Sequence, residues 1–511
     1  MNQTPSSGRI LGFLAGMLAL LTALPLIAKE NFQDASGGYL RLLSNHYSHV
    51  IAAGVDVYGR DTNGIWLASM DINQGGQPAR ADPAVKRTYR NIHAPRGSNL
   101  YWDQPYLVAA YNLSRVTGDP RYAQAASRYV TDFLARCVSQ TNGLFLWGNH
   151  LYYDVFEDKI VGFSGGHHEA RPLPCAWKMF WTLAPQETAR CIRTMGVQHV
   201  KDATGLFDRH ASVTATNPPT GGEKGTHPFL EAGGVLVESL SWLYAQQGNH
   251  ETALKDRALL VARFSFNHRD AKTGLLQNDP GPKGRWDYVA CTTEVGLWAG
   301  CLLRSADYTG VGEFRTMARH AVDAYLRYGY DPAMHRYYGQ LTVADGSPRK
   351  PLKRTATSGG EDTMYQPGEY ADLWEPLFPT HNYPMCLAEA CLTLYEQTHE
   401  DRYKQAVLRV ADLIARNTPA NGGKGAYADQ YGRCIHFLLH AARTLNDPKL
   451  FDDARRLAAE AVSQLYSKSA GMFRSHPGED RCDAVDGMGI LFLSLLSLET
   501  GTEPELLGFG W

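Results

Sequence analysis

Segments in which apolar residues return every three or four positions recur along this chain, and each of them opens with a polar turn. This spacing places the apolar side chains on one face of a helix, which is typical of helices on the outside of a larger body. The predicted outer helices are 118–137, 248–266, 310–329, 399–417 and 446–466.

Between these segments lie stretches that are apolar on nearly every side and rich in Gly, Ala, Ser and Cys. Small residues among large ones favour helices that are packed on all sides, so these stretches predict inner helices. A short turn with an apolar or aromatic step tends to follow each outer helix, and most of these turns contain Gly. The inner helices are then expected to begin near residues 101, 169, 228, 288, 381, 428 and 483.

The amphipathic segment 37–55 has no inner partner until the chain reaches 484–498, and closing a ring would pair the two. The turns are spaced irregularly, with long excursions at 144–168, 206–227 and 338–380, whereas an open solenoid needs a regular repeat. We therefore predict an all-α fold, an (α/α)7 toroid or barrel of helical hairpins, with long loops and short strands on one rim.

The N-terminus has the pattern of an exported protein. A polar stretch ending in Arg9 precedes an apolar run at 10–28 that closes on small residues. This predicts a signal peptide at 1–28 and a single catalytic toroid domain at 29–511, in a secreted or periplasmic protein. The run is almost long enough to span a membrane, so an uncleaved anchor is the alternative.

The overall charge excludes a broad nucleic-acid surface. The 511 residues include 50 Lys and Arg against 52 Asp and Glu, a formal net charge of −2, so an anionic partner has to be held by a local cluster. The nine cysteines are scattered without C-x-x-C spacing and mostly lie in apolar helical stretches. We expect them to be buried as small hydrophobic residues.

The stretch FSGGHHEARP at 163–172 concentrates candidate chemistry. His168 and Glu169 begin the zinc motif H-E-x-x-H, but Pro172 stands where the second histidine should be, and no metal is expected. Residues 162–166 satisfy G-x-S-x-G, which needs a strand-to-helix elbow on a parallel sheet that the pattern does not predict.

Aromatic and polar residues gather in the loops that link outer to inner helices, which all emerge at one end of such a ring. Flat aromatic faces suit the apolar faces of pyranose rings, so these loops predict a carbohydrate cleft. The expected substrate-binding residues are His167, Arg171, Trp147, Tyr152, Trp286, Trp102, Trp374, His381 and Asn382.

If the sugar is a uronate, β-elimination removes the proton beside the carboxylate and expels the glycosidic oxygen. Arg, His or Asn donors can neutralise the carboxylate, and a Tyr or His can move the proton, so no cofactor is required. Arg285 and Tyr288 stand three residues apart at an expected helix start, where they could clamp the carboxylate and act as acid and base. The other expected catalytic residues are His168, His227, Asn149 and His150.

In architecture the chain resembles the secreted α/α-toroid polysaccharide lyases, in particular the seven-hairpin glucuronan and alginate lyases of polysaccharide lyase family 38. Some of these carry an adjacent Asn-His pair, which Asn149 and His150 match in type. The resemblance implies metal-independent elimination on an acidic polysaccharide; no nucleic acid and no partner protein is expected.

Two alternatives remain open. One is a toroid glycoside hydrolase acting on unsaturated uronyl or related sugars with a pair of carboxylic acids. The acids available to it are Asp103, Glu231, Glu294, Asp372 and Glu375. The other is a noncatalytic glycan-binding protein, for which the aromatic residues suffice.

Overall fold

The computed structural model divides the chain into two units, Met1–Gly38 and Tyr39–Trp511. It describes residues 38–78, 97–148, 151–162, 166–171, 173–219, 226–281, 289–349, 370–374, 383–422 and 425–510. The predicted signal peptide at 1–28 lies outside the described residues. Among the described residues, no helix is both long and apolar enough to cross a membrane.

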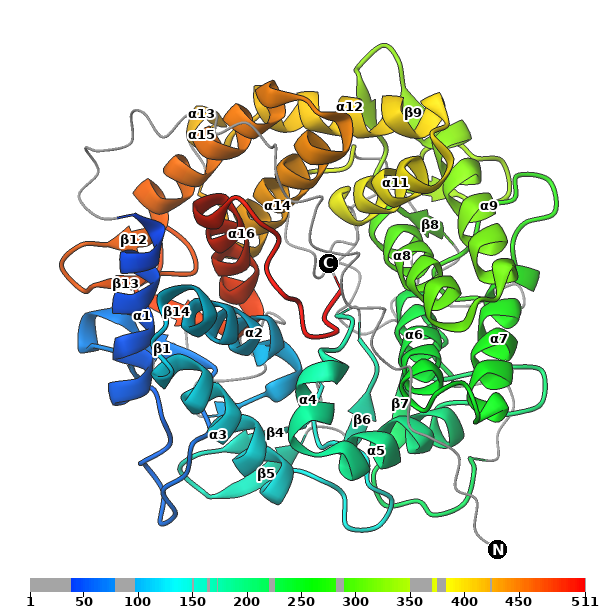
Figure 1. Ribbon diagram of the computed structural model, residues 1–511. Coiled ribbons are helices and arrows are strands. Elements are labelled where there is room, and N and C mark those ends of the chain that lie inside the picture. The colour runs from blue at the N-terminus through cyan, green and yellow to red at the C-terminus, as the bar shows by residue number, and fades with distance from the viewer. Residues whose placement is uncertain are drawn as a thin grey trace, which may run out of the picture. The chain divides into compact units, whose positions relative to one another are not determined.

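Within Tyr39–Trp511 the helices form two layers, with one inner and one outer helix in each hairpin (Figure 1). The inner helices are α2 (Leu100–Thr117), α4 (Trp177–Leu183), α6 (Leu230–Gln246), α8 (Thr292–Thr309), α11 (Met385–Thr398), α14 (Ala428–Leu445) and α16 (Met488–Thr500). The outer helices are α1 (Tyr39–Ala53), α3 (Arg121–Arg136), α5 (Pro185–Gln198), α7 (Thr252–Asn267), α9 (Gly312–Gly329), α12 (Asp401–Arg416) and α15 (Pro448–Leu465). The short α13 (Pro419–Gly422) belongs to neither layer.

The inner helices close a ring. Each of α6, α8, α11, α14, α16 and α2 packs against the next, and α1 packs against α16, as the sequence pattern predicts. The short α4 fills the remaining place through two hydrogen bonds: Trp177 Nε1 donates to Ser239 Oγ of α6 at 3.0 Å, and the Ala176 amide donates to Gln104 Oε1 of α2 at 2.7 Å. The (α/α)7 toroid is thereby confirmed.

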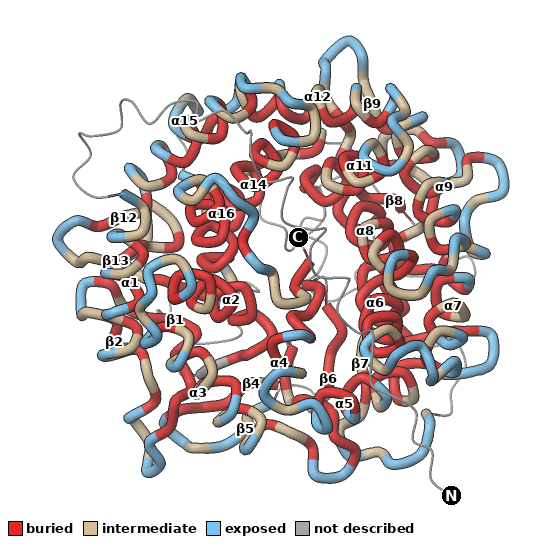
Figure 2. The backbone as a smooth tube through the Cα atoms, viewed as in Figure 1, coloured by how far each residue is buried: buried red, intermediate tan, exposed pale blue. Residues whose placement is uncertain are grey.

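Burial separates the two layers as their composition predicts (Figure 2). In α6 every residue from Leu230 to Tyr244 is buried, whereas α12 buries only an apolar stripe. Glycine allows the closest helix contacts. A Cβ on Gly489 would lie 2.1 Å from the Tyr106 amide nitrogen, and one on Gly296 would lie 2.2 Å from that of Leu387. Gly489 therefore allows α16 to pack closely against α2.

The predicted links are short turns closed by isolated backbone pairs. Val138 pairs with Phe145 and Val200 with Phe207, and Gly143 and Gly205 take the left-handed backbone conformation that these turns need, with φ of 82° and 90°. All nine cysteines are buried and free, so the prediction that they act as small hydrophobic residues is confirmed.

Short antiparallel strands extend several links. They are β1 (Ser69–Asp71), β2 (Gln77–Pro78), β3 (Gly97–Ser98), β4 (Leu151–Asp154), β5 (Lys159–Gly162), β6 (His167–Glu169), β7 (His210–Ser212), β8 (Val289–Cys291), β9 (Tyr330–Asp331), β10 (Arg336–Tyr337), β11 (Gln340–Thr342), β12 (Tyr466–Ser467), β13 (Met472–Phe473) and β14 (Arg481–Asp483).

One expected helix start was wrong. Residues His168 and Glu169 lie in β6, and the inner helix α4 begins only at Trp177. Pro172 and Pro174 stand between them in the sequence, and proline lacks the amide hydrogen that a helix interior needs. The other inner helices begin within five residues of their expected positions.

Candidate active site

The strand pair β6–β7 joins residues that are about forty positions apart in the sequence. The two strands are antiparallel, with His167 opposite Ser212, His168 opposite Ala211 and Glu169 opposite His210. Since side chains alternate between the faces of a strand, His167 and Glu169 share one face of β6 while His168 lies on the other. His168 is fully buried, and His167 is half-buried.

Glu169 is the centre of a buried cluster of charges. Its Oε1 lies 3.6 Å from Arg171 Nη1, 3.6 Å from Arg209 Nε and 3.5 Å from His210 Nε2. Burial alone would raise the pKa of Glu169, but Arg171, His210 and Arg209 hold it well below its usual value. The carboxylate is therefore ionised and orients three cationic side chains around it.

His210 is held between two carboxylates. Its Nδ1 lies 3.5 Å from Asp208 Oδ1, opposite the contact of Nε2 with Glu169. Burial opposes protonation, but the hydrogen bonds to Asp208 and Glu169 raise the pKa of His210 above its usual value. The same contact outweighs burial at Asp208 and lowers the pKa of that carboxyl to about 2. The two carboxylates therefore favour the protonated, positively charged form of His210.

The two most exposed side chains of this cluster are those of Arg209 and His210. The side chain of Glu169 is 0% exposed, that of Arg171 2% and that of Asp208 11%, whereas those of Arg209 and His210 are 15% and 21% exposed. Arg171, Arg209 and protonated His210 carry three positive charges against the two negative charges of Glu169 and Asp208. An approaching carboxylate would meet the cations, with Glu169 behind them.

His168 belongs to a buried chain of hydrogen bonds behind the cluster. Trp147 Nε1 donates to His168 Nε2 at 2.9 Å, His168 Nδ1 lies 2.8 Å from His199 Nε2, and His199 Nδ1 lies 2.7 Å from the carbonyl oxygen of Asp208. Because the indole can only donate and the carbonyl can only accept, each imidazole is neutral and donates from Nδ1.

The protonation of both histidines agrees with this chain. Burial and then the neighbouring His199 lower the pKa of His168 well below its usual value, and burial lowers that of His199 to about 4. Both ring nitrogens of His168 are occupied, so it is unsuited to take a proton from substrate. Its place in the structure is that of a residue that positions β6 and, through His199, Asp208.

Two further predicted residues lie beside the cluster. The half-buried rings of His167 and His227 lie 5.9 and 6.0 Å from the ring of His210. The carbonyl oxygen of His227 accepts a hydrogen bond from the Arg209 amide at 3.0 Å, and the Arg209 guanidinium lies over Phe229 at 4.6 Å. The structure thus brings together His167, His168, Arg171 and His227.

The predicted aromatic residues that the structure describes have separate surroundings. Trp147 is 1% exposed, so the expectation that it stacks on a sugar is wrong, and its role is in the hydrogen-bond chain to His168. Trp102 is 8% exposed and packs edge-to-face on Tyr101. Trp374 is half-buried and donates to the carbonyl oxygen of Asn417 at 2.5 Å, while half-buried Tyr152 lies on β4.

Seven predicted site residues fall outside the described residues. They are Asn149, His150, Arg285, Trp286, Tyr288, His381 and Asn382. Their roles stay predictions.

The sequence-based prediction missed the residues that complete the cluster, which are Glu169, Asp208, Arg209 and His210. The signal for three of them was present, because Asp-Arg-His at 208–210 lies within the long excursion predicted at 206–227. Glu169 and His210 also provide the carboxylate oxygen and imidazole nitrogen that divalent transition metals bind, 3.5 Å apart. In the described structure Arg171 Nη1 and Arg209 Nε also lie 3.6 Å from this carboxylate oxygen.

Residues 75–277, which include the whole of this cluster, match the family model for periplasmic pectate lyase. This match covers less than half of the chain and names a different family from the glucuronan and alginate lyases. No curated protein matches the chain.

Among solved structures, the chain is similar to an α-1,6-mannanase from Salegentibacter, with 11% identity over 90% of this chain and 99% of that chain and a TM-score of 0.46. A family 76 glycoside hydrolase from a bovine Bacteroides thetaiotaomicron strain gives 12% identity over 91% and 79%, with a TM-score of 0.47. A cellobiose 2-epimerase from Bacillus thermoamylovorans gives 9% identity over 90% and 98%, with a TM-score of 0.46.

Proposed function

We propose that this protein is a secreted or periplasmic polysaccharide lyase that cleaves a uronic-acid polymer by β-elimination. The observation that carries the proposal is the cationic accessible side of the Glu169 cluster, formed by Arg209 and His210. The match of residues 75–277 to periplasmic pectate lyase supports an enzyme that acts on polysaccharides.

β-Elimination needs positive charge beside the uronate carboxylate. When a base removes the proton beside the uronate carboxylate, negative charge develops on a group that is already anionic. Arg209 and His210 could pair with the carboxylate oxygens and stabilise this charge, while Glu169 keeps the two cations in place. The base takes the proton from the carbon beside the carboxylate, and the neighbouring carbon loses its bond to the glycosidic oxygen. A double bond then forms between these two carbons.

The base itself must be unprotonated, which does not suit His210, because its pKa is raised. Tyr288, outside the described residues, remains the predicted group that takes the proton and returns one to the leaving oxygen. His227, half-buried beside His210, is the second proposed base. Asn149 and His150 remain proposed donors to the substrate, with Arg285 as a further clamp on the carboxylate.

The acidic residues of this chain that a glycoside hydrolase mechanism would use have different surroundings from those of Arg209 and His210. Asp103 is 1% exposed and accepts a hydrogen bond from Tyr129 of outer helix α3. Glu231 and Glu294 are 0% and 1% exposed, and the Glu231 amide donates to Glu294 Oε2 at 3.1 Å. Asp372 accepts from the Trp374 amide, and Glu375 lies outside the described residues. Of these acids, Asp103, Glu231 and Glu294 are therefore less exposed than the side chains of Arg209 and His210.

The test is a progress curve at about 235 nm, where a conjugated unsaturated uronate absorbs, on polygalacturonate, glucuronan, alginate and glycosaminoglycans. We expect a rise on one polymer, abolished in Arg209→Gln and in Tyr288→Phe, and unchanged in His320→Gln on outer helix α9. Reducing ends released without absorbance would refute the lyase and favour the hydrolase. Binding with no product of either kind would favour the noncatalytic alternative.

The same assay with EDTA tests metal independence. Activity that survives EDTA assigns the neutralisation of the carboxylate to protein cations. Activity lost in EDTA and restored by a divalent ion would refute metal-independent elimination.

A further inference from the structure

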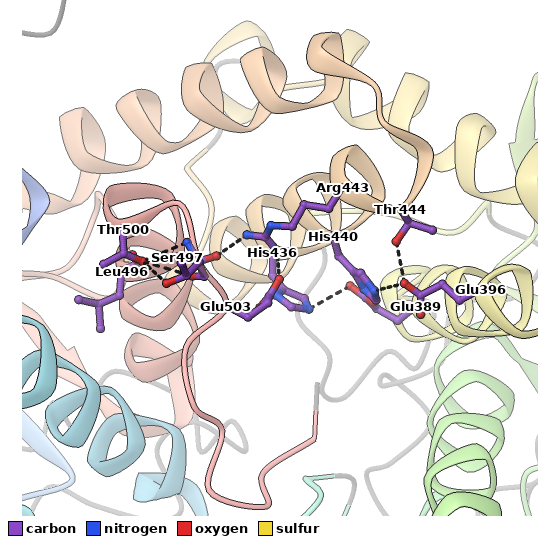
Figure 3. Close-up of polar contacts among 11 residues, drawn as sticks. Glu389, Glu396, His436, His440, Arg443, Thr444, Leu496, Ser497, Thr500 and Glu503 are labelled. Carbon is purple, nitrogen blue, oxygen red and sulfur yellow. Dashed lines mark hydrogen bonds and ion pairs between the residues drawn. The ribbon is translucent and has the colours of Figure 1, made fainter. Parts of the chain in front are cut away.

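A second cluster of ionisable side chains lies between inner helices α11 and α14, separate from the β6–β7 cluster. Glu389 and Glu396 belong to α11, and His436 and His440 belong to α14. His436 and His440 are four residues apart and so share one face of their helix. Figure 3 shows the four side chains pointing toward one another across the gap between the two helices.

Glu389 contacts both histidines. Its Oε2 lies 3.1 Å from His440 Nδ1, and its Oε1 lies 3.6 Å from His436 Nε2. One ligand atom from each of Glu389, His436 and His440 can be chosen so that all three lie within 4.8 Å of one another. Ligand atoms about 2.0 to 2.1 Å from a tetrahedral zinc stand roughly 3.3 Å apart, so the more widely separated of these atoms would have to move closer together to complete three ligands.

The other nitrogen of His440 has the partner that metal-binding histidines usually have. His440 Nε2 lies 2.9 Å from Glu396 Oε1, and Thr444 Oγ1 donates to the same oxygen at 2.7 Å. A carboxylate on the far nitrogen fixes the orientation and tautomer of a metal-bound imidazole and raises its basicity. The position of Glu396 therefore leaves Nδ1 of His440 as the atom directed at Glu389 and His436.

The charges of the cluster leave room for a cation. Glu389 and Glu396 bring two carboxylates to the cluster, and the ring of His440 lies between them. The nearby guanidinium of Arg443 is ion-paired with Glu503 and also donates to Ser497. A divalent ion bound between His440 and Glu389 would balance the charges of both carboxylates.

We propose that Glu389, His436 and His440 bind a divalent transition-metal ion such as Zn²⁺, with Glu396 and Thr444 supporting His440. Two imidazole nitrogens and one carboxylate select zinc or a neighbouring transition metal over Ca²⁺ and Mg²⁺, which prefer oxygen ligands. The side chains of Glu389 and His440 are 17% and 25% exposed, so a fourth ligand can come from solvent.

The test titrates Co²⁺ into EDTA-treated protein, following the visible d–d absorbance, and counts bound Zn²⁺ by elemental analysis. His436→Gln and Glu389→Gln are expected to bind one metal equivalent fewer than the wild type. His320→Gln is the matched control, because His320 is an exposed helical histidine whose ring contacts the carbonyl oxygen of Thr316. It should bind as the wild type does.

Further variants keep the test decisive. Glu396→Gln should retain the site but weaken Co²⁺ binding about 10- to 100-fold, because it changes only the support of His440. His210→Gln must retain the equivalent that His436→Gln loses, which separates this site from the β6–β7 cluster and from the outcome of the lyase assay. Equal metal content and spectra in the wild type, His436→Gln and Glu389→Gln would overturn the proposal and leave an ion-pair cluster. Circular dichroism of the metal-free variants checks that they are folded.

Discussion

Glu169→Gln provides the sharpest test of the buried charge cluster, because the change removes one charge and little volume. At an effective dielectric constant of about 20, each cation at 3.5 to 3.6 Å attracts the carboxylate by roughly 4 to 5 kcal/mol, before the cost of burying the charges. Removing one partner of a buried ion pair costs about 3 to 5 kcal/mol, since it leaves the other charge uncompensated. We expect Glu169→Gln to lower the free energy of unfolding by this amount, since Arg171 would stay buried.

The assay is urea unfolding followed by the fluorescence of the ten tryptophans. The matched control is Glu313→Gln on outer helix α9, where Glu313 forms a closer ion pair with Arg263, at 2.6 Å, but with side chains 40% and 50% exposed. An exposed pair contributes about 0.2 to 1 kcal/mol, so the control should change little. Equal losses in the two variants would refute the reasoning that burial, and not distance, decides the effect.

Two further predictions follow from pKa and packing. The pKa of Glu169 is lowered on folding, so its stabilisation is present above its unfolded pKa of about 4.3 and is lost as the pH falls through the folded pKa. The difference in unfolding free energy between wild type and Glu169→Gln should therefore shrink in acid. Part of it should also be lost as the pH rises through the folded pKa of His210, which the contact with Glu169 raises. A difference that stays constant down to pH 3 would contradict the assignment. Gly296→Ala, whose Cβ would meet the Leu387 backbone at 2.2 Å, should lower the unfolding free energy by about 1 to 3 kcal/mol. Gly300→Ala on the same helix meets only Arg304 Nη1 at 3.4 Å and should raise the unfolding free energy by up to about 1 kcal/mol, so similar thermal midpoints for the two variants would contradict this view of α8–α11 packing.

The fold was largely predictable, because helix periodicity is a local signal that repeats. The predicted segment 446–466 contains α15 (Pro448–Leu465), where the apolar stripe is bounded by a polar turn. The closing pair of α1 and α16 was predictable because each segment otherwise lacked a partner. The hairpin of α4 and α5 was harder, since α4 has only seven residues and so shows less than two full turns of the pattern.

The site was predictable only in part, because its central contact is not local. His168 and Arg171 lie within the stretch 163–172. Arg209 and His210 come close to it through the pairing of β6 with β7, which are each three residues long. Such strands are too short to show alternation between polar and apolar residues. Nor does sequence distinguish a rim residue from a buried one: Trp147 and Tyr152 have similar surroundings in the sequence, yet Trp147 is buried and Tyr152 is half-buried.

The Glu169 cluster shows how a protein with a net charge of −2 can concentrate positive charge locally. Its positive charge must be concentrated, and Arg171, Arg209 and His210 would repel one another at such short range without a counter-charge. Buried Glu169 supplies that counter-charge from behind, while the chain from Trp147 through His168 and His199 to the Asp208 carbonyl ties β6 to the segment before β7. Because each of these groups depends on the next for its orientation, an accessible cationic surface can form on strands too short to be stable by themselves.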